Sequence, residues 1–155
     1  MSRIVTLRNL IGTSVSNNAA LDRHQLHTIR GLKGYRITKF ELLPYDFGAT
    51  ASELEATVKV YSEHPGTPDA QIDFSDNRLI AAAVMAGAVD AYNYGISDAI
   101  IFDSQIFNQD IYVTYYNNKT NEAAGFVNYY IELEQIDLAL DEATVATLKD
   151  IRNSN

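Results

Sequence analysis

The sequence predicts an all-β fold, a β-sandwich resembling a jelly roll, with roughly seven or eight strands. Short segments rich in β-branched and aromatic residues recur along the 155-residue chain, and polar loops separate them. Several of these segments alternate apolar and polar residues, the period of a half-buried strand. A chain of this length buries a core without covalent links, which agrees with the absence of cysteine.

The beginning of the chain differs from the rest. Residues 1–18 join a short apolar run to the polar patch "GTSVSNN", which predicts an N-terminal arm that orders only against a neighbouring chain. The remaining residues, 19–155, are predicted to form one sandwich domain. The segment 18–30 fits either a short helix or a polar edge strand.

The predicted strands follow in order. "YRITKFELL" ends at Pro44, which cannot donate to a ladder. "ELEATVKVYS" alternates most clearly and predicts a half-buried strand, "HPGT" predicts a type II turn, and a further strand is expected near Ile72. The alanines of "RLIAAAVMAGAV" favour a helix, but its shortness and its neighbours favour a buried strand, which we predict. "AIIFD", "DIYVTYY" and "FVNYYIELEQI" complete the set.

One short amphipathic helix is predicted at residues 141–152. Asp141 is a candidate N-cap, and Val145, Leu148 and Ile151 recur at helical spacing. This apolar stripe is expected to cover either the sheet of its own chain or a partner.

The charges are distributed unevenly along the chain. Residues 1–40 hold seven basic side chains and one acidic one, +6, while residues 41–155 hold five basic and nineteen acidic, −14. Such a split fits either complementary faces within one fold or a basic segment that contacts an acidic neighbouring subunit. In the second case Arg3 and Arg8 would contact acids of residues 132–137. The acidic body argues against nucleic acid as a partner, except through the basic arm.

Residues 108–135 read as a hairpin whose two faces both carry aromatic side chains. One face holds the apolar residues expected in the core, and the other collects Tyr112, Tyr116, Phe126 and Tyr130. Aromatic rings with a polar tip are common at subunit interfaces, so these four residues are candidate interface residues. Two alternatives remain: a loop or the C-terminal helix of the same chain covers them, or they form a sugar-stacking platform, which the absence of tryptophan weakens.

No pattern predicts catalysis, a cofactor or a metal site. The chain has no nucleophile elbow, no Walker loop and no dinucleotide-binding fingerprint. Two weak metal-site candidates are more consistent with ordinary surface residues: the histidines His24, His27 and His64, and the acids Asp69, Asp73 and Asp76. No signal peptide or membrane span is expected either.

The C-terminal part resembles small virion structural proteins of marine bacteriophages, many of which are built on a jelly-roll-like sandwich. The segments that carry the resemblance are "IIFDSQIFNQDIYVTYYNN", "VNYYIELEQIDL" and "DEATVATLKDIRN". The resemblance implies a non-enzymatic coat, decoration or vertex protein, made in the host cytoplasm and located in the virion. Its expected partners are copies of itself and other capsid subunits. The alternative is a carbohydrate- or receptor-binding sandwich module of a tail or fibre.

Overall fold

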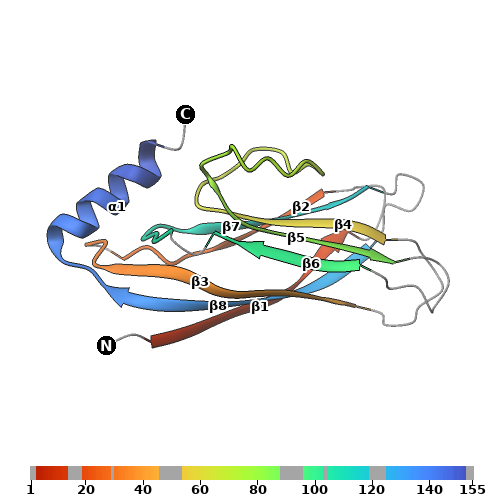
Figure 1. The fold of residues 1–155 in the computed structure, drawn as a ribbon, viewed down its shortest axis with the longest axis horizontal. Helices are drawn as coiled ribbons and strands as arrows, with labels where there is room; N and C mark the ends of the chain where they lie inside the picture. Colours follow the sequence, from red (N-terminus) through yellow and green to blue (C-terminus); the bar gives the residue numbers. More distant parts are fainter. Residues whose placement is uncertain are drawn as a thin grey trace.

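Two antiparallel sheets of three and five strands face each other in the computed structural model, and one helix lies at the end of the sandwich (Figure 1). This confirms the predicted all-β sandwich. The structure describes residues 3–13, 19–28, 30–45, 54–87, 96–102, 105–118 and 125–152. The elements are β1 Arg3–Thr13, β2 Ala19–His24, β3 Lys33–Pro44, β4 Leu54–Tyr61, β5 Leu79–Gly87, β6 Ile96–Ile101, β7 Ile111–Asn117, β8 Gly125–Asp137 and α1 Leu140–Arg152.

The strand order is that of a jelly roll. The sheets run β1-β8-β3 and β2-β7-β4-β5-β6. The first strand therefore pairs with the last, the second with the seventh and the fourth with the fifth, as in a long hairpin folded onto itself. The third strand lies near the sixth, but β6 pairs with β5 instead, so the sheets have three and five strands.

The core lies between the sheets and follows the alternation of each strand. Tyr129 and Ile131 of β8 face Val113 and Tyr115 of β7, and all four are buried. The alanine-rich strand is confirmed as β5, because burial inside a sheet outweighs the helix propensity of alanine. Its small side chains at Ala81 and Ala83 belong to the same core.

The predicted arm is wrong for residues 3–13. They form β1, and every one of them pairs with β8 in the same chain. Alternate residues point inward: Ile11 is 2% exposed, and Val5 and Leu7 pack against the core. The interspersed arginines and polar residues hid this period-two pattern. The other residues of the predicted arm lie outside the described part of the chain.

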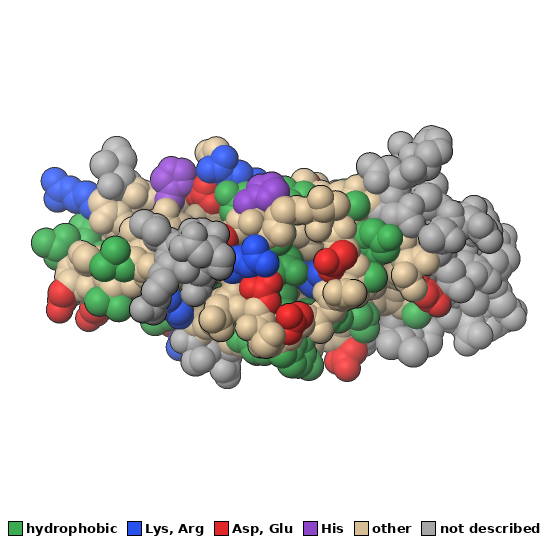
Figure 2. All heavy atoms as spheres, turned by 90° about the horizontal axis from the view of Figure 1, so that it is seen from above, with side chains coloured by type: hydrophobic (Ala, Val, Ile, Leu, Met, Phe, Trp, Pro, Cys, Tyr) green, Lys and Arg blue, Asp and Glu red, His purple; other side chains and the backbone are tan. Residues whose placement is uncertain are grey.

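A long loop covers the outside of the five-stranded sheet. Residues 62–78 lie over it (Figure 1), and Figure 2 views this side of the molecule. The strand predicted near Ile72 is wrong, because turns occupy this segment. The predicted type II turn agrees with the positive φ of Gly66, 87°. Strand β4, expected to be half-buried, is instead buried on both faces, including Thr57 and Lys59.

The C-terminal helix is confirmed, but a different side of it contacts the domain. Ala143 is buried, whereas Val145 is 67% and Leu148 59% exposed. The Asn108 amide donates hydrogen bonds to the Ala143 carbonyl at 3.2 Å and to Thr147 Oγ1 at 2.8 Å. The predicted apolar stripe therefore does not cover the chain's own sheet at these two positions; the side chain of Ile151 lies outside the described residues.

The helix begins at Leu140, so Asp141 lies in the first turn and is not the N-cap. Its carboxylate still suits the positive end of the helix dipole. No helix in the described residues is long and apolar enough to cross a membrane.

Candidate functional site

The outer face of the three-stranded sheet is hollowed and exposed. We call it the open face: the outward side chains of β1, β8 and β3. The register sets them in rows across the sheet, one row with Arg8, Tyr130 and Glu41 and the next with Leu10, Asn128 and Leu43. The hollow has a volume of about 690 Å³. It is lined by Arg8, Asn9, Leu10, Lys39, Glu41, Leu43, Asn128, Tyr129 and Tyr130.

Apolar side chains are exposed on this face. Leu43 is 66% and Leu10 37% exposed, and Ile4 and Tyr45 lie exposed nearer its two ends. The ring of Tyr45 packs edge-on against Phe126, with centroids 5.8 Å apart. Exposed apolar groups gathered on one face with polar neighbours are typical of a binding surface.

The charges of the open face are paired mainly along β3 and β8. On the open face, opposite charges face each other at Arg36 with Glu134 and at Lys39 with Glu132. Lys33 and Asp137 form a third pair at the end of the same two strands, on the other side of the sheet. The acids that the sequence analysis places against a neighbouring subunit therefore have basic partners in their own sheet. This favours the first explanation of the charge split, complementary surfaces within one fold.

Tyr130 lies at the centre of the open face. The Lys39 ammonium lies 5.8 Å from its ring centroid and 3.6 Å from Glu41 Oε1. Desolvation and a hydrogen bond to Glu132 raise the pKa of the Tyr130 hydroxyl above its usual range. The phenol is neutral over the physiological range and presents an aromatic ring beside both signs of charge.

The four candidate interface aromatics do not share one face, and this part of the prediction is wrong. β7 and β8 are not a hairpin, because they belong to different sheets. Tyr112 and Tyr116 lie on the outside of the five-stranded sheet, while Phe126 and Tyr130 lie on the open face. Local alternation alone could not show this crossing from one sheet to the other.

The two candidate arginines are also separated. Arg8 lines the hollow of the open face. Arg3 lies at the start of β1, five residues before Arg8. Because side chains alternate along a strand, Arg3 points to the side of the sheet opposite to Arg8. Of the six predicted interface residues, only Arg8, Phe126 and Tyr130 share the open face.

Tyr112 contacts its own chain. Its ring lies 5.3 Å from that of His64 in the covering loop, and the Arg23 guanidinium lies 6.0 Å from its centroid. It also packs against a small cluster that includes Tyr61. A loop of the same chain therefore covers Tyr112, which is the first of the two alternatives to a subunit interface.

A buried carboxylate fixes the segment after β2. Asp110 is 7% exposed and accepts hydrogen bonds from Arg23 Nε at 2.9 Å, from the Leu26 and His27 backbone amides at 3.0 and 3.1 Å, and from the His27 ring. Burial raises the pKa of Asp110, but the bonds from His27, Arg23 and the two amides outweigh it and hold it at about 2. The charged acid thus holds the chain between β2 and β3 against the start of β7.

A second, partly buried cluster joins the two sheets. The Tyr129 hydroxyl of β8 donates to Asp22 Oδ2 at 2.9 Å and lies 2.7 Å from His24 Nε2; both partners belong to β2. Burial raises the pKa of Tyr129 above its usual range and lowers that of His24, with Asp22 opposing the latter shift. All three polar groups are satisfied, so the cluster links the sheets at this edge.

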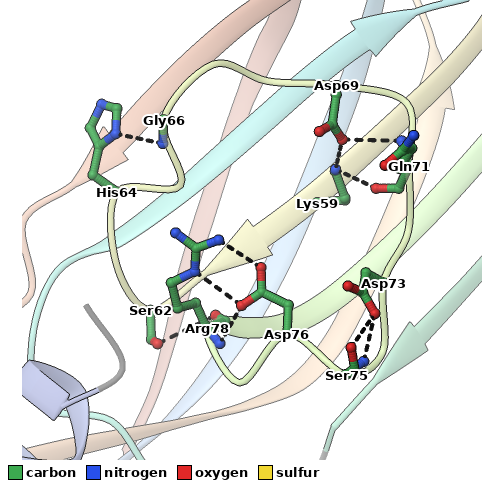
Figure 3. A network of polar contacts seen from close by, with 10 residues as sticks. All are labelled: Lys59, Ser62, His64, Gly66, Asp69, Gln71, Asp73, Ser75, Asp76 and Arg78. Atoms are coloured by element: carbon green, nitrogen blue, oxygen red, sulfur yellow. Dashed lines mark hydrogen bonds and ion pairs between the residues drawn. The ribbon is translucent and has the colours of Figure 1, made fainter. Parts of the chain in front are cut away.

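The covering loop is fixed by a network of its own (Figure 3). The Lys59 ammonium, on a side chain only 2% exposed, donates to Asp69 Oδ1 at 2.7 Å and to the Gln71 carbonyl at 2.5 Å. Asp76 accepts two bonds from the Arg78 guanidinium, at 3.0 and 2.8 Å. The acids considered as calcium ligands thus bond to Lys59 of β4 and to side chains and amides of the loop itself.

The histidines are not gathered for a metal ion. His24 contacts Tyr129, His27 contacts Asp110, and His64 accepts from the Gly66 amide at Nδ1, 3.0 Å away. Within the described residues, no group of three or more histidine, cysteine or acidic side chains is placed to hold a metal.

Removing Asp69 is expected to destabilise the fold through Lys59. Asp69→Ala leaves a buried ammonium with the Gln71 carbonyl and the Tyr61 ring as its neighbours, at an expected cost of about 2 kcal/mol in the free energy of unfolding. Adding Lys59→Met removes the charge and is expected to recover most of that loss. Urea denaturation of both variants tests this; no recovery in the double variant would contradict it.

Sequence reasoning missed the leucines of the open face, although a signal for them exists. "NLIG" and "ELLP" each contain two large aliphatic residues in succession, and neighbours in a strand point to opposite faces. One member of each pair must therefore lie outside the core. The structure buries Ile11 and Leu42 and exposes Leu10 and Leu43.

Comparisons with protein-family models, with curated proteins and with solved structures give no match for this chain.

Proposed function

We propose that this chain is a non-enzymatic structural protein of a bacteriophage virion, which self-assembles or docks on the capsid as a coat, decoration or vertex protein. The observation that carries the proposal is a jelly-roll strand order combined with exposed apolar side chains on three separate surfaces. Jelly rolls are widespread among viral capsid domains, an analogy of fold that supports the proposal together with the C-terminal resemblance.

The three apolar surfaces lie on different elements. The first is the open face. The second is the outward side of α1, and the third lies where the covering loop meets β6. Their exposed members are Ile4, Leu10, Leu43 and Tyr45; then Leu140, Val145 and Leu148; then Ile72, Phe74 and Ile100. A protein with a single partner needs one such surface, whereas a subunit with several neighbours uses more.

The buried ionisable groups support a structural role. Asp110 holds a loop, Tyr129 links the sheets, and Lys59 fixes the covering loop. Each has partners within the chain whose loss would disturb the fold. Contacts within the chain therefore account for these three buried groups, as they do for ion-pair networks in many proteins.

Self-association of the purified chain tests the proposal. Light scattering is expected to give a molar mass that rises above the 17.2 kDa of one chain as concentration increases. A mass that stays at one chain up to roughly millimolar concentration, where contacts of about 4 kcal/mol are already populated, would contradict self-assembly.

A carbohydrate- or receptor-binding module is the second candidate, and the hollow of the open face favours it. Tyr130 offers a ring beside Arg8, Glu41 and Asn128, the mixture of an apolar platform and hydrogen-bonding groups that small polar ligands need. A glycan array separates the candidates. Binding by a monomer that Tyr130→Ala abolishes would favour this function, whereas no binding together with self-association would favour the virion protein.

A further inference from the structure

We propose that the open face is a dimer contact, on which the open face of a second copy packs about a two-fold axis parallel to β8. This inference rests on the proposed self-assembly and specifies its geometry. The open face is the outer side of the three-stranded sheet. Its residues form rows that run at right angles to the strands. What a second copy meets on it follows from those rows.

The two-fold axis exchanges the outer strands of the sheet. Because β8 lies between β1 and β3, an axis just above β8 and parallel to it sets β1 of one copy over β3 of the other. Arg8 then faces Glu41 of the partner subunit, and Leu10 faces Leu43 of the partner subunit. Each of these contacts occurs twice. The outward residues of β8 meet their own copies at the axis, among them Tyr130, Glu132 and Glu134, and the charges of the two glutamates are balanced by Lys39 and Arg36 of their own sheet.

The alternative orientation lacks this complementarity. An axis at right angles to the strands through the same row would set each strand over itself in reverse. Arg8 would then face Arg8 of the partner subunit, and Glu41 would face Glu41 of the partner subunit, so like charges would meet at both edges. The order of residues across the row therefore selects the parallel axis.

The open face has no net charge, so two copies of this acidic protein can pack through it without repulsion. The whole chain carries −8, which would repel a second copy if it were spread evenly. The open face instead balances three cations against three anions, namely Arg8, Arg36 and Lys39 against Glu41, Glu132 and Glu134. Two copies thus meet on a surface that is neutral overall.

The groups that would pair are accessible. Within the described part of the chain, Arg8 forms no ion pair. Glu41 has only the long contact to Lys39, 3.6 Å between two well-exposed side chains, and pairs of this kind are weak in water. Leu43 and Leu10 lose their exposure on pairing, which supplies an apolar contribution on either side of the axis.

The area of the face predicts a weak dimer. Strands about 4.8 Å apart and about 3.4 Å per residue give three strands of this length roughly 14 by 37 Å. Each copy would therefore bury on the order of 500 Å², and the pair about 1,000 Å², the lower end for specific interfaces. A dissociation constant near or above the micromolar range is expected, as suits a subunit that other contacts also hold.

A charge exchange between two variants tests the contact. Arg8→Glu gives one chain two acids on the central row, and Glu41→Arg gives the other chain two bases. Each variant alone is expected to self-associate at least about tenfold more weakly than the natural chain, because like charges meet twice. An equimolar mixture pairs opposite charges twice and is expected to return to within about threefold of the natural dissociation constant. Sedimentation velocity measures all three.

Matched variants separate this contact from other causes. Asp137→Arg changes the net charge as Glu41→Arg does, but the exposed Asp137 side chain leaves β8 on the side opposite to Tyr130 and is expected to leave association unchanged. Leu43→Asn removes an apolar group from the face and is expected to weaken association; circular dichroism verifies that each variant is folded.

The outcomes are distinguishable. If the natural chain associates but the mixture does not recover, or if either single variant associates normally, the dimer contact is wrong while self-assembly stands. If the natural chain has the mass of one chain throughout, both the contact and the proposed self-assembly are wrong.

Discussion

A chain that lacks residues 1–13 is expected not to fold. Every residue of β1 pairs with β8, so the deletion removes one of the three strands of its sheet and leaves β8 as an edge. It also removes Ile11, Val5 and Leu7 from the core. Far-UV circular dichroism is expected to show no cooperative thermal transition. A thermal transition identical to that of the full chain would show instead that residues 1–13 are an arm outside the core, as the sequence predicts.

Two neighbouring residues of β1 provide a matched comparison. Ile11→Ala opens a cavity in the core and is expected to lower the free energy of unfolding by about 2–4 kcal/mol. Leu10→Ala truncates a partly exposed side chain on the open face and is expected to cost less than about 1 kcal/mol. Equal losses in urea denaturation would show that β1 does not present these two faces.

Asp110→Ala is expected to be the most damaging single substitution outside the apolar core. It removes the acceptor for Arg23, for the His27 ring and for two backbone amides. Breaking a buried ionic cluster by removing one partner costs about 3–5 kcal/mol. Asp98→Ala, an exposed acid, is the control and is expected to change the free energy of unfolding by less than about 0.5 kcal/mol.

The same carboxylate predicts how stability depends on pH. The pKa of Asp110 is lowered to about 2 in the folded chain, against 3.8 for an unperturbed acid. Its contribution is therefore complete above about pH 4 and is lost as pH falls toward 2. The loss amounts to about 2 kcal/mol over that window. Urea denaturation from pH 7 to 2 is expected to show a smaller acid loss in Asp110→Asn than in the natural chain; identical pH profiles would contradict the role of Asp110.

The sequence predicted a strand correctly where the local residue pattern matches the burial of that segment in the fold. The alternation around Val58 and the apolar run at β5 predicted strands that the structure contains. The strand expected near Ile72 failed because a few apolar residues in a loop resemble a strand. That loop covers β4. Lys59 of β4 is buried because Asp69 and Gln71 of the loop lie over its ammonium group and accept hydrogen bonds from it.

The candidate site was harder to predict because it depends on which strands are neighbours. Tyr116 and Phe126 are close in sequence, yet they belong to different sheets. Arg8, Tyr130 and Glu41 are far apart in sequence, and only the β1-β8-β3 register places them in one row. Pairing between distant strands leaves no local signal, whereas the doubled leucines at Leu10 and Leu43 left one that could have been used.

Crosslinking through a single introduced cysteine tests the central claim, that copies of this chain meet through the open face. The chain has no cysteine, so Asn128→Cys supplies one thiol in the middle strand, next to the axis. With sheets packed about 10 Å apart, a short bifunctional thiol reagent spans two copies. Asn128→Cys is expected to give a covalent dimer at concentrations where Thr67→Cys, in the exposed part of the loop over the other sheet, stays monomeric. Equal crosslinking of the two variants, or none in either, would contradict the account.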